Sequence, residues 1–69
     1  MLMKLVCRLK DILDSRGMKQ NYIAKEANLS KTSVSSIVNG KTIPTLPVAL
    51  KIAKVLELKI EEIWVDENV

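Results

Sequence analysis

The residues from Lys31 to Asn39 combine two kinds of side chain at helical spacing. Val34, Ile37 and Val38 fall within an arc of about 100° on a helical wheel, which predicts a buried face. The opposite arc carries short polar side chains: Lys31, Thr32, Ser35, Ser36 and Asn39. Such groups donate and accept hydrogen bonds, as reading base edges in the DNA major groove, about 12 Å wide, requires. The alternative is that this face is simply solvated.

The composition of this segment favours a binding role over plain helix formation. Five of the seven residues from Ser30 to Ser36 are Ser or Thr. Their hydroxyls compete for backbone hydrogen bonds, so they weaken a helix locally. Something other than helix propensity therefore favours them.

Charge is distributed unevenly along the 69 residues, whose formal net charge is +3. Residues 1–41 carry eight Lys or Arg and three Asp or Glu, a net of +5, so this part could face a polyanion. Residues 57–69 carry five acids against Lys59 alone, a net of −4. Phosphates would repel that end, so we expect it to point away from them.

The pattern of apolar residues predicts a single all-α domain over residues 1–69, a compact five-helix bundle with an acidic tail at 65–69 that frays after Val65. The expected helices are Lys4–Ser15, Gln20–Ala27, Lys31–Asn39, a fourth that is apolar over much of its circumference and ends near Leu56, and Ile60–Trp64. The second and third form a tight helix-turn-helix unit at about residues 20–39.

Capping residues support these helix boundaries. Gly17 stops the first helix, and Asn28 ends the second because Asn adopts the left-handed conformation readily. Ser30 suits the N-cap of the third helix, and Thr45 can cap the fourth, with Pro47 tolerated in its first turn.

Several classes of function are disfavoured. Cys7 is the only cysteine and histidine is absent, so we expect no intrachain disulfide, no metal site and no cofactor. No serine has an evident base and no glycine-rich phosphate loop is present, so the chain is not expected to be an enzyme. The single cysteine fits a reducing cytoplasm, and no apolar stretch is long enough to span a bilayer, so we expect a cytoplasmic location.

The stretch from Gly17 to Trp64 resembles the helix-turn-helix domain of the phage Cro and repressor type, the XRE family. The matching residues are Gln20, Ala24, Ser30, Val34, Ser35, Ile37, Gly40, Lys41, Pro44 and Leu50 to Ala53. Arg8 to Met18 and Leu58 to Trp64 are also similar to the first and last helices of that family.

The resemblance implies a set of DNA contacts on this chain. Base contacts would come from Lys31, Thr32 and Ser36, with Ser35 beside them. Phosphate contacts would come from Gln20, Ser30, Asn39, Lys41 and, with weaker support, Lys19. Ser30 is equally explained as a helix cap and Asn39 as a helix terminator. Because the reading face has one Lys among short hydroxyls, we expect modest base specificity, partly read through DNA shape.

One departure from some relatives affects the core. Leu13 and Val38 occupy positions where those relatives carry a buried Arg and Glu that pair with each other. Replacing both partners of a buried ion pair by apolar residues is often neutral or stabilising. We therefore expect Leu13 and Val38 to be in contact.

The resemblance also implies a homodimer on a palindromic double-stranded operator, acting as a small transcriptional regulator, in our interpretation a repressor. The apolar residues Ile60, Ile63, Trp64 and Val65 are candidates for the dimer interface. The alternative for Trp64 is that it closes the core of the monomer. An alternative function is an antitoxin-like or other protein-interaction module that uses Ile60 to Val69 to bind another protein.

Overall fold

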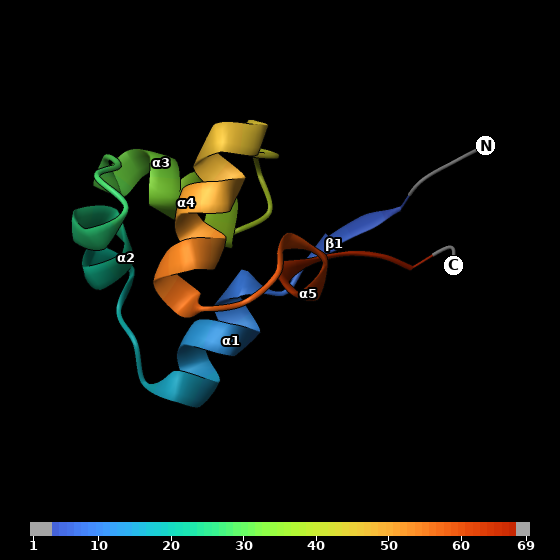
Figure 1. The fold of residues 1–69 in the computed structure, drawn as a ribbon, viewed down its shortest axis with the longest axis horizontal. Helices are drawn as coiled ribbons and strands as arrows, with labels where there is room; N and C mark the ends of the chain where they lie inside the picture. The colour runs from blue at the N-terminus through green and yellow to red at the C-terminus, as the bar shows by residue number, and fades with distance from the viewer. Residues whose placement is uncertain (1–3, 68–69) are drawn as a thin grey trace.

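The computed structural model describes residues 4–67 and contains five helices and two short strands (Figure 1). In chain order these are β1 (Leu5–Cys7), α1 (Leu9–Arg16), α2 (Gln20–Glu26), α3 (Lys31–Val38), α4 (Leu46–Leu56), α5 (Ile60–Ile63) and β2 (Trp64–Asp66). The prediction of five helices in a compact bundle is confirmed. The two strands were not predicted.

The strands correct the prediction at both ends of the chain. The expected helix from Lys4 is wrong for Leu5–Cys7, because this segment pairs antiparallel with Trp64–Asp66. Arg8 N donates to Ile63 O at 2.8 Å and Glu67 N donates to Lys4 O at 2.9 Å, one bond at each end of the pair. The frayed tail is therefore wrong for residues 66 and 67, and residues 68 and 69 lie outside the described part.

The helix ends follow the predicted local chemistry with two exceptions. Asn28 has a φ of 56° and Gly40 a φ of 73°, so both take the left-handed conformation that closes α2 and α3. Thr45 stands at the N-cap of α4 but its side chain makes no capping hydrogen bond. Glu57, with a φ of 58°, closes α4 in the conformation that glycine usually adopts.

A continuous apolar core joins all five helices. Its fully buried members include Leu9 of α1, Ile23 of α2 and Val34 of α3, together with Ile52, Leu56 and Ile63. No polar or charged side chain is buried within residues 4–67. The shape of the domain therefore rests on apolar packing, and its polar groups remain at the surface.

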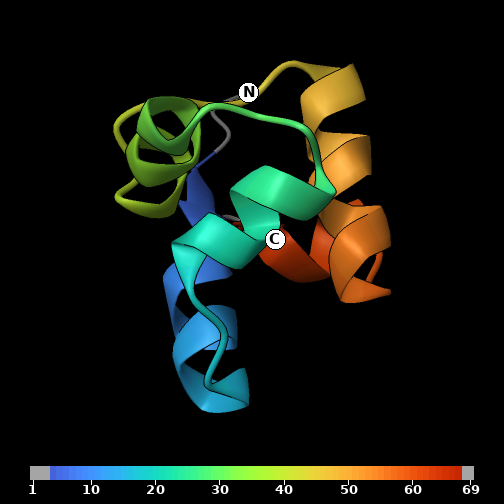
Figure 2. The ribbon, with the colours of Figure 1, turned by 90° about the vertical axis from the view of Figure 1, so that its left-hand side faces the viewer.

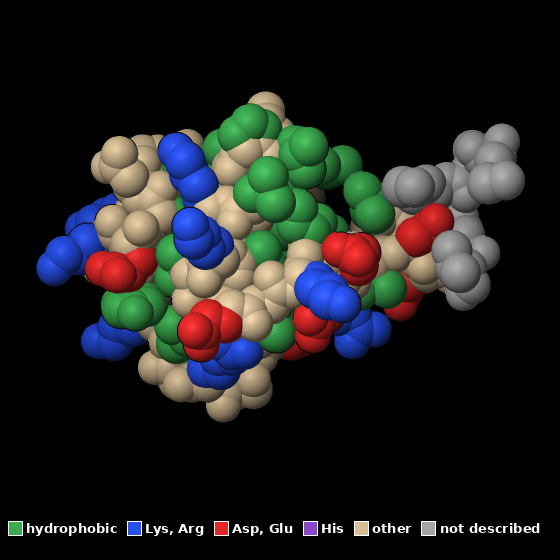
Figure 3. Space-filling model, in the orientation of Figure 1, with side chains coloured by type: hydrophobic (Ala, Val, Ile, Leu, Met, Phe, Trp, Pro, Cys, Tyr) green, Lys and Arg blue, Asp and Glu red, His purple; other side chains and the backbone are tan. Residues whose placement is uncertain are grey.

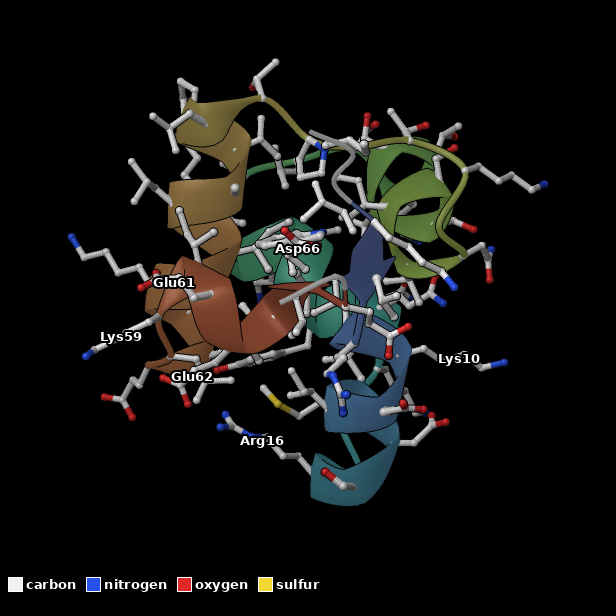
Figure 4. All side chains as sticks on the ribbon, turned by 90° about the vertical axis from the view of Figure 1, so that its right-hand side faces the viewer. Lys10, Arg16, Lys59, Glu61, Glu62 and Asp66 are labelled. Atoms are coloured by element: carbon white, nitrogen blue, oxygen red, sulfur yellow. The ribbon has the colours of Figure 1, made fainter. Side chains whose placement is uncertain are left out.

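A hydrogen bond between residues far apart in the sequence joins α1 to α4. The guanidinium of Arg16, at the end of α1, donates from Nη1 to Leu56 O at 2.8 Å, and Figure 4 shows the side chain extending from α1. A cation at the last carbonyls of α4 complements the negative end of that helix. In the described part of the chain, no helix has the length and apolar character needed to cross a membrane.

Candidate nucleic-acid interface

The two faces of α3 lie as predicted. Val34, Ile37 and Val38 are 0%, 4% and 4% exposed and form part of the core. The polar residues of the reading face are exposed at Lys31, Thr32 and Asn39 and half-buried at Ser35 and Ser36. The helix is thus fixed along one side and presents hydrogen-bonding groups along the other.

The N-terminus of α3 is capped by Ser30. Its Oγ accepts a hydrogen bond from Ser33 N at 3.1 Å and donates to Ser33 Oγ at 2.8 Å. The capping role of Ser30 is therefore confirmed, whereas its phosphate contact remains a prediction. Ser33 is exposed beside it and was not predicted as a site residue, although the Ser-x-x-Ser spacing from N-cap to third helical position was visible.

At the C-terminus of α3, two candidate contact residues are joined. Asn39 Nδ2 donates to Ser35 Oγ at 3.3 Å, which leaves the hydroxyl proton of Ser35 free to be donated elsewhere. Lys41 N donates to Ser36 O at 2.9 Å, across the left-handed Gly40. Because this main-chain group closes the helix, only the side chain of Lys41 can reach a phosphate.

The start of α2 lies at the edge of a hollow of about 350 Å³. Its lining residues are Lys10, Leu13, Asp14, Met18, Lys19, Gln20, Asn21 and Val38. Lys19 is exposed and Gln20 half-buried, so both predicted phosphate contacts lie at one place. The N-cap residue Lys19 makes no side-chain capping bond to α2.

Lys10 also lines this hollow and was not among the predicted site residues. It lies on the outer side of α1, and in Figure 4 its side chain extends away from the body of the protein. Its charge was visible in the sequence, but its place beside the start of α2 depends on how α1 packs. The same hollow is lined by Leu13 and Val38, which are both buried in one core cluster, as expected for residues in contact.

The residues proposed for a dimer interface are placed differently from one another. Ile63 has no exposed surface and Trp64 is 9% exposed, so both fill the core of the monomer, as the alternative for Trp64 stated. Ile60 and Val65 are half-buried and keep some surface. The dimer contact thus remains a prediction, and Ile63 offers no surface to a partner in this conformation.

The helix-turn-helix unit lies at the surface of the bundle. Figure 2 looks onto α2 and α3, which meet across the short turn between Glu26 and Lys31. Leu29 N in this turn donates to Ala24 O of α2 at 2.8 Å, which fixes the sharp change of direction. In Figure 3, Lys and Arg side chains project on the α2 side with an acidic side chain among them, and both signs of charge lie over α5. Along the sequence, the excess of positive charge lies in residues 1–41 and the excess of negative charge in residues 57–69. The electrostatics thus favour a polyanion on the side of α2 and α3.

The known proteins that this chain matches are helix-turn-helix proteins or transcriptional regulators. The helix-turn-helix family model matches residues 9–63. An HTH-type transcriptional regulator of Methanocaldococcus jannaschii is 34% identical over 61 residues, which cover 88% of this chain and 92% of that protein. One from Bacillus subtilis is 28% identical over 62 residues, covering 88% of this chain and 94% of that protein.

A solved structure supports the fold. The crystal structure of a transcriptional regulator from Listeria innocua has a TM-score of 0.70 and 25% sequence identity over 80% of this chain. This chain spans about half, 51%, of the length of that protein. The family match runs from the first residue of α1 to the last residue of α5. The chain therefore belongs to the XRE family of helix-turn-helix proteins, which are DNA-binding transcriptional regulators.

Proposed function

We propose that this protein recognises specific double-stranded DNA sequences by placing α3 in the major groove, and that it represses transcription as a homodimer. The observation that carries the proposal is the division of α3 into a core-packed face and a polar outward face. A helix held rigidly by Val34, Ile37 and Val38 can present short side chains to base edges at close range.

Base recognition is assigned to the outward face of α3. The ammonium group of Lys31 can donate to guanine O6 or N7, and the methyl group of Thr32 can pack against a thymine methyl. Ser35 and Ser36 supply shorter-range hydrogen bonds. Since only Lys31 among these carries a charge, the preference for sequence is modest at each position.

Phosphate contacts are assigned to both sides of α3, where they set the register of docking. Lys19, Gln20 and Lys10 line one hollow at the start of α2. The remaining phosphate contacts are Ser30, Asn39 and Lys41, which flank α3 itself. In this arrangement the two groups of residues would contact the DNA phosphates on either side of the major groove that α3 enters.

The same arrangement supports a role as a dimeric repressor. A two-fold dimer places two recognition helices on successive major grooves about 34 Å apart, which matches a palindromic operator. Bound across a promoter, such a dimer excludes the polymerase without any further contact, whereas activation needs an additional surface. A reporter gene carrying the selected operator within its promoter should therefore lose expression when the protein is present.

The test of DNA recognition compares Lys31, on the outward face of α3, with Lys51, which carries the same charge on α4. Lys31→Ala and Thr32→Ala should each weaken binding to a duplex selected by the wild-type protein from a random pool by about 5- to 100-fold. Lys51→Ala, on the exposed side of α4, removes the same charge and should change affinity much less. Equal affinities for all three variants would overturn the proposal.

Salt dependence gives an independent measure of the phosphate contacts. The logarithm of the affinity should fall linearly with the logarithm of salt concentration, with a slope of about −0.9 per contact. Lys19→Ala should reduce that slope by about one contact and weaken all sequences alike. A flat salt response of the wild-type protein would contradict the phosphate assignments.

A further inference from the structure

A hollow of about 300 Å³ lies between α3 and the loop that follows it. On the α3 side it is lined by Thr32 and Ser36, which are both proposed base contacts, and on the loop side by residues 42–45. None of the lining residues carries a charge. The apolar part of the lining includes the buried Ile37 and the half-buried Leu29 and Val48. We refer to this space as the loop hollow.

Ile43 is the side chain of the loop hollow that the fold uses least. It is 70% exposed, more than any other large hydrophobic side chain in residues 4–67. Single exposed apolar side chains are common on protein surfaces, so exposure alone does not mark a site. Ile43, however, lines the same hollow as Thr32 and Ser36. The apolar side chain thus continues the proposed base-reading surface beyond the end of α3.

The backbone around Ile43 is held in place before DNA binds. Lys41 N donates to Ser36 O at 2.9 Å, which ties the start of the loop to α3. Figure 4 shows the loop running back beside α3 before it crosses to α4. Pro44, itself half-buried, restricts the backbone of Ile43 to the extended region. Because the loop is already fixed at both ends, a contact made by Ile43 costs little conformational freedom.

The chemistry of the loop hollow distinguishes between the groups that DNA presents. A phosphate is bound by cationic side chains or N–H donors, and the hollow has no charged side chain. In the major groove the alkyl group that a base edge offers is the 5-methyl group of thymine. The methyl group of Thr32 and the side chain of Ile43 line one space, so a thymine methyl between them would be covered by apolar groups.

We propose that the loop hollow receives the methyl group of a thymine, and that Ile43 is a specificity-determining residue in addition to those of α3. The inference rests on the proposed function, because it deepens the recognition of bases by α3. It adds sequence information at one base pair to a reading face that has one Lys among short hydroxyls. The half-site should therefore contain one thymine whose selection depends on Ile43.

The test removes the thymine methyl group without changing base pairing. Each thymine of a duplex that the wild-type protein selects from a random pool is replaced in turn by deoxyuridine, and the dissociation constants are measured at one salt concentration. At one position of the half-site, the replacement should weaken wild-type binding about fourfold, the factor expected for one buried methyl group. For Ile43→Ala, the factor at that position should fall below about twofold.

Leu50→Ala is the matched control. Leu50 is also a large aliphatic side chain, 53% exposed on α4, but it does not line the loop hollow. This variant should keep the fourfold factor, because a ratio between two duplexes cancels any general change in affinity. Since Ile43 is exposed, Ile43→Ala should leave the melting temperature nearly unchanged. In selection from a random pool, Ile43→Ala should lose the preference for thymine at this position and keep the other preferences.

The outcomes separate the loop hollow from the proposed function. A selected duplex in which no deoxyuridine replacement weakens wild-type binding overturns the inference and leaves DNA recognition by α3 intact. An Ile43→Ala variant that keeps the full factor does the same. A wild-type protein that selects no duplex refutes the proposed function, and the inference with it.

Discussion

The α2–α3 unit and the β1–β2 pair are built by opposite kinds of interaction. The helix unit is specified by signals a few residues apart, such as the Ser30 cap and the left-handed Asn28. The strand pair joins Leu5 to Asp66 across nearly the whole chain, with only three residues in each strand. The α2–α3 unit is thus specified by local signals, whereas the pairing of β1 with β2 depends on contacts between the two ends of the described chain.

The strand pair nevertheless supports the helix unit. Two short strands alone are marginal in water, so their stability must come from packing on the helices. Trp64 of β2 is buried in the core, and Cys7 Sγ of β1 donates weakly to Ile37 O of α3 at 3.4 Å. The family match covers residues 9–63, and both strands lie outside it. The strands therefore act as a support that packs against the helical core.

The largest expected effect comes from removing the side chain of Trp64, which packs the strand pair against the core. Trp64→Ala should lower the free energy of unfolding by about 3–5 kcal/mol, because it leaves a cavity in a small core. Since a domain of this size has only about 3–10 kcal/mol in total, much of the variant should be unfolded at 37 °C. Urea unfolding followed by circular dichroism measures this loss.

The neighbouring residue provides the control for this prediction. Val65→Ala truncates a half-buried side chain in the same strand and should cost clearly less. If the two variants were equally stable, Trp64 would not anchor the strand pair, and the contrast between strand pair and helix unit would fail.

An intermediate effect is expected from breaking the ladder itself. The bonds from Arg8 N to Ile63 O and from Glu67 N to Lys4 O make Val6 and Val65 the hydrogen-bonded pair between them. Val65→Pro removes the donor of Val65 and should cost about 1–3 kcal/mol more than Val65→Ala. In the fraction that remains folded, affinity for DNA should be nearly unchanged. A large loss of affinity in that fraction would show that the strand pair positions α3 directly.

The smallest expected effect tests the local encoding of the helix unit. Ser30→Ala removes the cap of α3 and should cost about 1 kcal/mol in thermal or urea unfolding. Thr45→Ala is the matched control, because Thr45 stands at the N-cap of α4 without a capping bond and should change stability little. The reverse order of effects would mean that the observed cap does not stabilise α3.

Sequence reasoning succeeded where structure is local. The helical spacing of Val34, Ile37 and Val38 and the Ser30 cap predicted α3 to within one residue. It failed at Leu5 to Cys7, because apolar residues next to a helix extend the helical pattern equally well. Only the partner strand, about 60 residues away, makes that segment extended.

The candidate site shows the same limit. The outward residues Lys31 and Thr32 could be identified from helical spacing alone. The position of Lys10 beside Gln20, and the exposure of Leu46 and Leu50, depend on how separate helices pack. The apolar residues around Trp64 made it a plausible contact for a partner protein. In the structure, however, Trp64 belongs to the paired strand β2 and its side chain is buried in the core.

The central claim is that DNA meets α2 and α3 and leaves the strand pair untouched. Backbone amide shifts of the labelled protein, recorded by NMR while a selected duplex is added, test it residue by residue. The largest changes should fall at residues 19–22 and 30–41, with little change at residues 64–67 relative to the protein without duplex. Changes concentrated in β2 and α5, with α3 unaffected, would contradict the account.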